Sequence, residues 1–127
     1  MSAAKPQNAA VWFEIPAADF ERAVGFYEKI FATQLRREKF GPSEMAVFPY
    51  EGKAVSGCIM AGEGYKPGAD GSLVYLHSTT DLNGPLARVK AAGGEVATPK
   101  TALPPGMGFF AHFVDSEGNR VGLHSLE

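Results

Sequence analysis

The stretch from Ala10 to Tyr27 constrains the fold most, because it joins a strand pattern directly to a helix pattern. Residues 11–15 are rich in β-branched and aromatic side chains, which favours a strand. Pro16 cannot donate to a strand ladder, and Asp19 is a suitable N-cap for a helix. Beyond it, apolar residues recur at helical spacing, namely Phe20, Ala23, Val24, Tyr27, Ile30 and Phe31. We therefore expect a strand that needs partners and an amphipathic helix that covers it.

The same unit recurs later in the chain. The segment WFEIPAADF at 12–20 aligns with VYLHSTTDL at 74–82, an offset of 62 residues, and EGKAV at 51–55 aligns with EGNRV at 117–121, an offset of 66. Periods of this size usually mark solenoids or arrays, but two copies are too few for an array. We interpret the pattern as a duplication within one domain.

Each copy has the element order strand, helix, strand, strand, strand. In the first copy we expect strands at 11–15, 34–40, 45–50 and 55–60, and in the second at 72–77, 95–100, 109–114 and 120–125. The second helix is expected to begin near Asn83 and to end at Gly93–Gly94. The predicted fold class is therefore α+β with two βαβββ modules. The predicted boundaries are a flexible lead-in at 1–8, a single domain over 9–127, and modules over about 9–61 and 72–127.

Composition and charge exclude several kinds of partner. The formal net charge of the 127 residues is −2, and acidic and basic residues are mixed along the chain, which gives no electrostatic footprint for nucleic acid or an anionic membrane. One cysteine excludes an intrachain disulfide. The first ten residues lack the apolar core of a signal peptide, and no apolar run approaches the roughly 20 residues that span a bilayer. We expect a cytoplasmic protein whose partners are small molecules or proteins.

These features together resemble the glyoxalase/bleomycin-resistance/dioxygenase superfamily, also called the vicinal oxygen chelate superfamily. The resemblance rests on the strand–corner–helix stretch ending in Phe26–Tyr27, on the duplicated layout, and on the closing sequence FVDSEGNRVGL at 113–123. It covers about residues 9–125 and is strongest to the branch related to lactoylglutathione lyase. It implies two βαβββ modules whose strands form a curved sheet around a cavity, in a homodimer. Apolar residues on both faces of the first strand, such as Val11 to Phe13, also favour a homodimer, because two helices alone cannot cover them.

The resemblance also implies where a metal would bind. In metal-using members, four ligands drawn from His, Gln and Glu come from the first and last strands of each module. Carried over to this chain, these positions are Ala10, Ser56 with Gly57 beside it, Ser72 and Gly122. None of these residues is a good ligand for a divalent ion. We therefore expect no metal, no other cofactor, and no isomerisation of the glutathione hemithioacetal of methylglyoxal.

Two residues of the first strand are candidates for ligand contact. Strand alternation places Glu14 on the face of Ala10, and therefore toward the cavity. In glutathione-using relatives a basic residue near this position pairs with the tripeptide carboxylate, so Glu14 would repel that ligand. The alternative is a structural carboxylate satisfied by Arg120, Arg22 or backbone groups. Trp12 lies on the same face and either stacks on a planar ligand or belongs to the core or a dimer interface.

The chain's single cysteine aligns with a histidine. The 66-residue offset makes Cys58 equivalent to His124, and an imidazole facing a thiol can generate a thiolate nucleophile. A lone cysteine in a strand of small residues is usually an inert filler, and its neighbours supply no positive charge. We predict that Cys58 is a packing residue. His77 and His112 are interpreted as core or surface histidines, so the catalytic residues stay unassigned.

The resulting functional prediction is a metal-free small-molecule binding protein, of the sequestering or sensing kind found among antibiotic-resistance relatives. The candidate ligand-binding residues are Trp12, Glu14, Cys58, Met60, Val74 and His124. The alternative is an enzyme, a lyase, isomerase or dioxygenase acting on a small molecule with or without a divalent metal. A third hypothesis is a domain whose cavity is filled by side chains and that works through protein contacts. The sequence names neither the ligand nor a reaction.

Overall fold

The structure, a computed structural model, describes residues 4–127. The elements are β1 (Trp12–Pro16), α1 (Phe20–Phe31), β2 (Arg36–Phe40), β3 (Ser43–Val47), β4 (Ser56–Ala61), β5 (Tyr75–His77), α2 (Asn83–Ala92), β6 (Glu95–Ala102), β7 (Phe109–Val114) and β8 (Arg120–Ser125). This is the order βαβββ twice, as predicted, and the fold is α+β. Residues 1–3 of the predicted lead-in lie outside the described residues, and residues 4–8 form no helix or strand.

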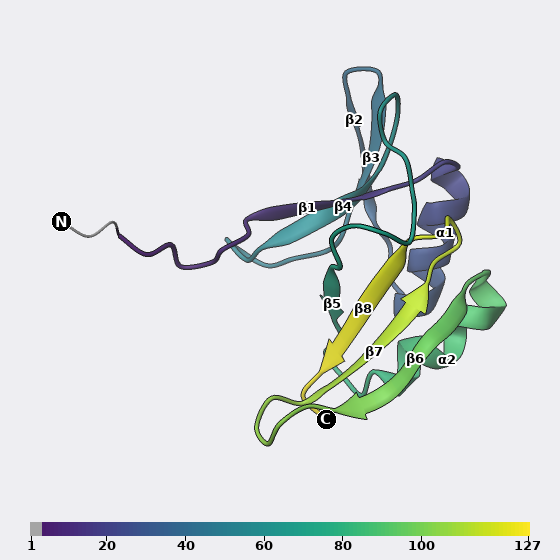
Figure 1. Cartoon of the computed structure of the whole chain (residues 1–127). Helices are drawn as coiled ribbons and strands as arrows, with labels where there is room; N and C mark the ends of the chain where they lie inside the picture. Colours follow the sequence, from purple (N-terminus) through teal and green to yellow (C-terminus); the bar gives the residue numbers. More distant parts are fainter. Residues whose placement is uncertain (1–3) are drawn as a thin grey trace.

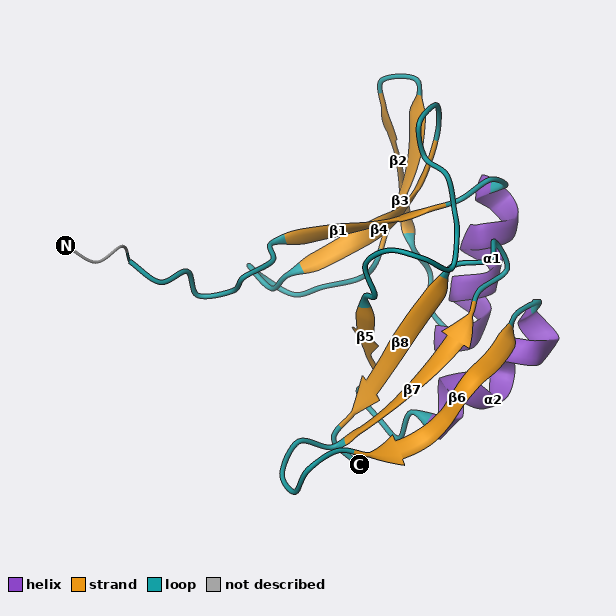
Figure 2. Ribbon diagram, in the orientation of Figure 1, coloured by secondary structure: helices purple, strands orange, loops and turns teal. Residues whose placement is uncertain are grey.

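The strands form two sheets of four, one from each module. Their orders are β1-β4-β3-β2 and β5-β8-β7-β6, so the first and last strands of each module are neighbours. These neighbours run parallel, and the other pairs run antiparallel. Figure 1 shows α1 and α2 side by side along the sheets, and Figure 2 shows the two sheets set at an angle to each other. We call the face of each sheet that points away from the helices its outer face.

The helix boundaries follow from local signals. Asp19 caps α1, because its Oδ1 accepts a hydrogen bond from the backbone N–H of Arg22 at 3.0 Å. Gly93, at φ 109°, ends α2 in the left-handed conformation that glycine adopts without strain. The buried face of α1 comprises Phe20, Ala23, Val24, Phe26, Tyr27 and Ile30. Both predicted helices are therefore confirmed.

Two predicted strands were misplaced. The strand predicted at 45–50 lies at Ser43–Val47, because Pro49 has no N–H to donate and the pairing with β4 ends before it. The strand predicted at 72–77 is shortened to Tyr75–His77, because this edge strand has β8 as its one neighbour and their residue pairs begin at Tyr75. The strands at 109–114 and 120–125 lie where they were predicted.

One apolar core joins the two modules. The ring of Phe26 on α1 lies 5.8 Å from that of Phe113 on β7, and the Tyr27 ring lies 5.6 Å from that of Phe48 in the first module. Helix α1 therefore packs against residues of both sheets.

The turn between β7 and β8, residues 115–119, ties the modules together through polar contacts. Buried Asp115 accepts a 2.6 Å hydrogen bond from the Tyr27 hydroxyl, and Asn119 Nδ2 donates to the Pro16 carbonyl at 2.8 Å. Burial, reinforced by the Asp115 charge, holds the pKa of Tyr27 well above its ordinary value. The turn therefore bonds both to itself and to the first module, through Tyr27 and Pro16.

Glu117 in the same turn fixes the corner between β1 and α1. Its carboxylate accepts hydrogen bonds from the amides of Ala18 and Asp19 at 3.0 and 2.8 Å, and from Arg22 Nε at 2.7 Å. Burial alone would raise the pKa of Glu117, but the bonds from Arg22 and the Asp19 amide outweigh burial and lower it. The closing sequence that carried the family resemblance is thus a structural connection.

Candidate functional site

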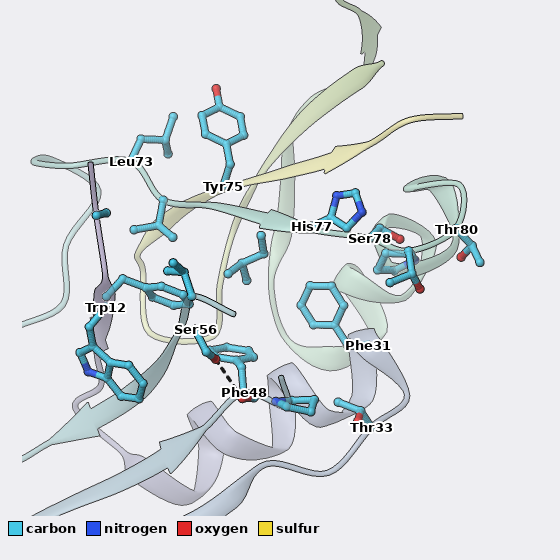
Figure 3. A pocket seen from close by; sticks show the side chains of 18 of the residues that line it. Trp12, Phe31, Thr33, Phe48, Ser56, Leu73, Tyr75, His77, Ser78 and Thr80 are labelled. Atoms are coloured by element: carbon cyan, nitrogen blue, oxygen red, sulfur yellow. Dashed lines mark hydrogen bonds between the residues drawn. The ribbon is translucent and has the colours of Figure 1, made fainter. Parts of the chain in front are cut away.

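A cavity of about 730 Å³ lies between the two modules. Trp12 and Ser56 border it from the first module, while Leu73, Tyr75 and His77 border it from the second (Figure 3). The aromatic side chains in its lining are Trp12, Phe13, Phe31, Phe48 and Tyr75, with the Phe13 and Phe48 rings 5.7 Å apart. The lining therefore includes several aromatic rings and draws on both sheet edges, β1 and β5.

The polar groups of this cavity are few. Its hydroxyls come from Thr33, Ser56, Ser78, Thr79, Thr80 and Tyr75. Arg88 is the one formally charged residue among the described lining residues, and its Nε donates to the Ile30 carbonyl at 2.8 Å. No aspartate or glutamate belongs to this lining.

The six predicted ligand-binding residues do not form one site. Trp12 and Val74 line the large cavity. Glu14 and Val74 line a second cavity of about 280 Å³, together with Arg120. Met60 and Cys58 are buried within the first sheet, and His124 lies on the second sheet. The structure therefore brings together Trp12 and Val74 but not the whole predicted set.

Cys58 and His124 do not form the thiol–imidazole pair that their alignment left open. The two residues occupy equivalent positions, opposite Glu14 on β1 and opposite His77 on β5, but on different sheets. Glu14 also lacks the predicted arginine partners, because Arg22 pairs with Glu117 and Arg120 donates to His112.

Cys58 is packed rather than exposed. Its side chain is fully buried with Val47 and Met60, and Met45 and Tyr65 pack against them. Burial raises the pKa of the Cys58 thiol to about 12, and the nearby Glu14 carboxylate adds to this effect. A protonated, covered thiol is a poor nucleophile, which supports the predicted packing role.

The first-strand residues that lie opposite Ser56 and Gly122 differ from those that the sequence alignment gave. Ser56 lies opposite Trp12 and Gly122 lies opposite Tyr75, so Ala10 and Ser72 precede the strands rather than belonging to them. Trp12 and Tyr75 are therefore equivalent, an offset of 63 residues on the first strands. The corner aspartates Asp19 and Asp81 are 62 residues apart, because the second corner is one residue shorter than the first.

The residues at the corrected positions do not fit a divalent ion. They are an indole, a hydroxyl, a phenol and a glycine, and the Ser56 hydroxyl already donates to the Phe48 carbonyl at 2.9 Å. Within residues 4–127, no group of three or more His, Cys, Asp or Glu side chains is placed to hold a metal ion.

The outer face of the second sheet carries a polar network that the sequence analysis missed. Tyr75 Oη lies 2.7 Å from His112 Nε2, and Arg120 Nη2 lies 3.1 Å from His112 Nδ1. In the next row, His77 Nδ1 lies 3.3 Å from His124 Nδ1. All three histidines of the chain therefore share one face. Strand alternation alone could place Tyr75 and His77 on one side of β5, but the shared face of three strands follows only from their pairing.

The comparisons with known proteins agree with this architecture. The model of the Glyoxalase/Bleomycin resistance protein/Dioxygenase superfamily matches residues 9–123. The chain belongs to this superfamily. A comparison with curated protein sequences gives no match.

Solved structures of the superfamily share the fold. A glyoxalase/bleomycin resistance protein from Albidiferax ferrireducens has a TM-score of 0.71 at 16% identity, with 93% of this chain and 98% of that chain covered. The fosfomycin resistance protein FosX from Listeria monocytogenes has a TM-score of 0.63 at 17% identity, with 93% of each chain covered. A mutant glyoxalase I from Zea mays has a TM-score of 0.65 at 21% identity, with 90% of this chain but only 44% of that chain covered. This superfamily member therefore spans less than half the length of the maize chain.

No helix in residues 4–127 is long and apolar enough to cross a membrane.

Proposed function

We propose that this superfamily member is a metal-free small-molecule binding protein whose site is the cavity between the two modules. The observation that carries the proposal is the cavity itself, because its volume of about 730 Å³ falls in the range of ligand sites, roughly 300–1,000 Å³. Aromatic walls with a few polar groups are the usual lining of such sites. Trp12 pairs with Ser56 and Tyr75 pairs with Gly122 on the first and last strands. Since none of these four is a good ligand for a divalent ion, they support binding without a metal.

The test is to fill the cavity from its edge. Val55 borders the cavity and is 43% exposed, so Val55→Trp adds bulk there without disturbing the core. Val96 lies on β6, outside the cavity lining, and is 46% exposed, so Val96→Trp is the matched control. The probe is anilinonaphthalene sulfonate, a fluorescent aromatic anion, followed by its displacement with a panel of small aromatic compounds.

We expect the wild-type protein and Val96→Trp to bind the probe alike, and Val55→Trp to bind it about tenfold more weakly, the effect of losing roughly 1.4 kcal/mol. Equal binding by all three proteins, or no binding by the wild type, would refute the cavity as the site.

We also propose a homodimer. Several large apolar side chains near the edge strands β1 and β5 are exposed, namely Val11, Trp12, Val55 and Leu73. Soluble monomers rarely expose such patches, because apolar surface gains free energy when it is covered. Sedimentation at micromolar concentration should show a dimer that Val11→Asp weakens and Val96→Asp does not, and a wild-type monomer would remove this proposal.

We also propose a cytoplasmic location. The free, buried Cys58 supports it, because thiols stay reduced in the cytoplasm.

A further inference from the structure

Tyr75, Gly122 and His112 form one row across the second sheet. Gly122 on β8 lies opposite Tyr75 on β5 and opposite His112 on β7. A side chain at Gly122 would collide with the Tyr75 ring, because a Cβ there would fall within the space that the ring occupies. The glycine therefore lets the phenol cross β8 and reach His112 Nε2 at 2.7 Å.

The partners of His112 fix the direction of its hydrogen bonds. The guanidinium of Arg120 can only donate, so His112 Nδ1, 3.1 Å away, must accept. A neutral imidazole with a bare Nδ1 carries its hydrogen on Nε2, which then donates to Tyr75 Oη. Burial and the Arg120 charge both lower the pKa of His112, which favours this neutral form.

The hydroxyl hydrogen of Tyr75 is consequently free to donate outward. Among the described residues, the Tyr75 hydroxyl has His112 as its one hydrogen-bond partner, and the residue is 48% exposed. Tyr75 also borders the large cavity, and its hydroxyl points away from Phe31 and Phe48 (Figure 3). The directed donor therefore lies on the outer face of the second sheet, beside the cavity that the rest of the Tyr75 side chain borders.

The chemistry of this donor favours an anion. Strands β5, β7 and β8 contain no aspartate or glutamate, and Arg120 lies one partner away from Tyr75 through His112. Glu14 and Asp70 line the smaller cavity with Arg120, so the preference comes from the hydroxyl rather than from net charge. A carboxylate would gain a charge-assisted hydrogen bond from this hydroxyl, whereas an ammonium group has no acceptor for its hydrogen.

We propose that the Tyr75 hydroxyl donates a hydrogen bond to an anionic oxygen of the ligand, and that the ligand is an aromatic carboxylate or a similar organic oxyanion. The assignment rests on the proposed function, since it places the ring of the ligand against the part of the cavity that Tyr75 borders, with the charged group of the ligand on the outer face of the second sheet. Tyr75 is the binding residue, and His112 and Arg120 are positioning residues.

The experiment compares three probes of equal ring size: benzoate, benzamide and benzamidine, which are anionic, neutral and cationic. Affinities are measured by titration followed in amide proton–nitrogen correlation spectra of the full chain. The variant is Tyr75→Phe, which removes only the hydroxyl oxygen, and the control is Tyr50→Phe, an exposed tyrosine outside the cavity lining.

We expect the wild type and Tyr50→Phe to bind benzoate more tightly than benzamide, and benzamide more tightly than benzamidine. Tyr75→Phe should weaken benzoate binding about tenfold and remove the preference, as expected for a lost hydrogen bond to a charged group. Side-chain nitrogen shifts of His112 provide a second readout that needs no ligand, and they should show the hydrogen on Nε2.

Three outcomes would overturn the inference: no preference for benzoate, an unchanged benzoate affinity in Tyr75→Phe, or a hydrogen on His112 Nδ1. If benzoate fails to bind while anilinonaphthalene sulfonate binds and Val55→Trp weakens it, the inference fails and the proposed function stands. If neither compound binds, both fail.

Discussion

The two modules share one strand order, yet their outer faces differ in character. On the first strands the two faces are alike, because Trp12 and Glu14 on β1 are exposed, as are their equivalents Tyr75 and His77 on β5. The difference lies on the last strands. Tyr65 from the connecting loop packs over buried Cys58 and Met60 on β4, whereas His124 on β8 is half-buried. The duplicated fold has thus kept its backbone pairing, while one last strand is covered by apolar packing and the other carries a histidine.

The hairpin turns that lead into the last strands also differ, and here the exposed glutamate belongs to the first module and the buried one to the second. Glu51 in the first module is exposed, and Gly52 and Lys53 beside it are exposed as well. The equivalent of Glu51 is Glu117, whose side chain is fully buried against Arg22. The second module therefore holds the first through its turn and keeps its sheet face free.

The largest expected effect is the loss of stability in Asp115→Ala. This carboxylate accepts hydrogen bonds from the Tyr27 hydroxyl, from the amides of Glu117 and Asn119, and from Asn119 Nδ2. Removing it leaves buried donors unpaired, so we expect the free energy of unfolding to fall by about 3 kcal/mol or more. Urea unfolding followed by circular dichroism measures this change.

The control is Asp70→Ala in the exposed connecting loop, which should change the free energy of unfolding by less than about 0.5 kcal/mol. We propose that residues 9–127 form a single cooperative domain, so both proteins should unfold in one transition. Two separate transitions, or equal stability of the two variants, would contradict this.

A smaller effect is expected at the matched pair Glu117→Gln and Glu51→Gln. The folded-state pKa of Glu117 is lowered, so its ionised form stabilises the fold at pH values above the ordinary glutamate pKa of about 4.3. That contribution disappears as the pH falls through the folded-state value. Near pH 7, Glu117→Gln should cost about 1–2 kcal/mol and Glu51→Gln nearly nothing.

Denaturant unfolding at several pH values distinguishes the two turns. The gap between wild type and Glu117→Gln should close as the pH falls below about 4. A gap that persists unchanged into acid would show that the Glu117 charge is not the source of the stability.

The packing of Tyr65 over Cys58 predicts that the thiol reacts slowly with labelling reagents. Cys58 is fully buried, so labelling of the native protein near neutral pH should require local opening. Tyr65→Ala removes the ring that packs over it and should speed labelling by roughly tenfold, whereas Tyr50→Ala should not. Rapid labelling of the wild-type protein would contradict a packing role for Cys58.

The smallest expected effect is that of divalent metals. The first and last strands place Trp12 opposite Ser56 and Tyr75 opposite Gly122, and these side chains do not make a ligand set for a metal ion. Adding nickel, zinc, manganese or iron(II) to chelator-treated protein should shift Tm by no more than about 1 °C, and the glutathione hemithioacetal of methylglyoxal should not turn over. Stoichiometric metal uptake with a rise of several degrees, or turnover restored by metal, would favour the enzyme alternative instead.

The sequence predicted the element order because its signals are local. The Asp19 cap, the glycine end of the second helix, and the strands at 109–114 and 120–125 each depend on neighbouring residues. The register between first and last strands was wrong by comparison, by two residues at Ala10 and by three at Ser72. The one-residue difference between the two corners accounts for the extra residue in the second module. The common error of two arises because the pairing register of distant strands leaves no local signal.

Local sequence signals could not predict the polar network on the second sheet. His112 and Tyr75 are 37 residues apart and lie on strands that are not neighbours, with β8 between them. Their contact requires the strand order, the pairing register and the missing side chain of Gly122 at once. Each histidine was visible in the sequence, but their shared face depends on the strand pairing.

The bonds from Glu117 to the β1–α1 corner also set when the chain can finish folding. Its partners Ala18 and Asp19 precede it by 99 and 98 residues. On the ribosome, the first module emerges long before the residue that completes the start of its helix is made, and closing so long a loop costs conformational entropy. The nascent first module therefore stays incompletely fixed until residues 115–119 have been made. Chains truncated before residue 115 should never acquire these contacts and should be targets for proteases and chaperones.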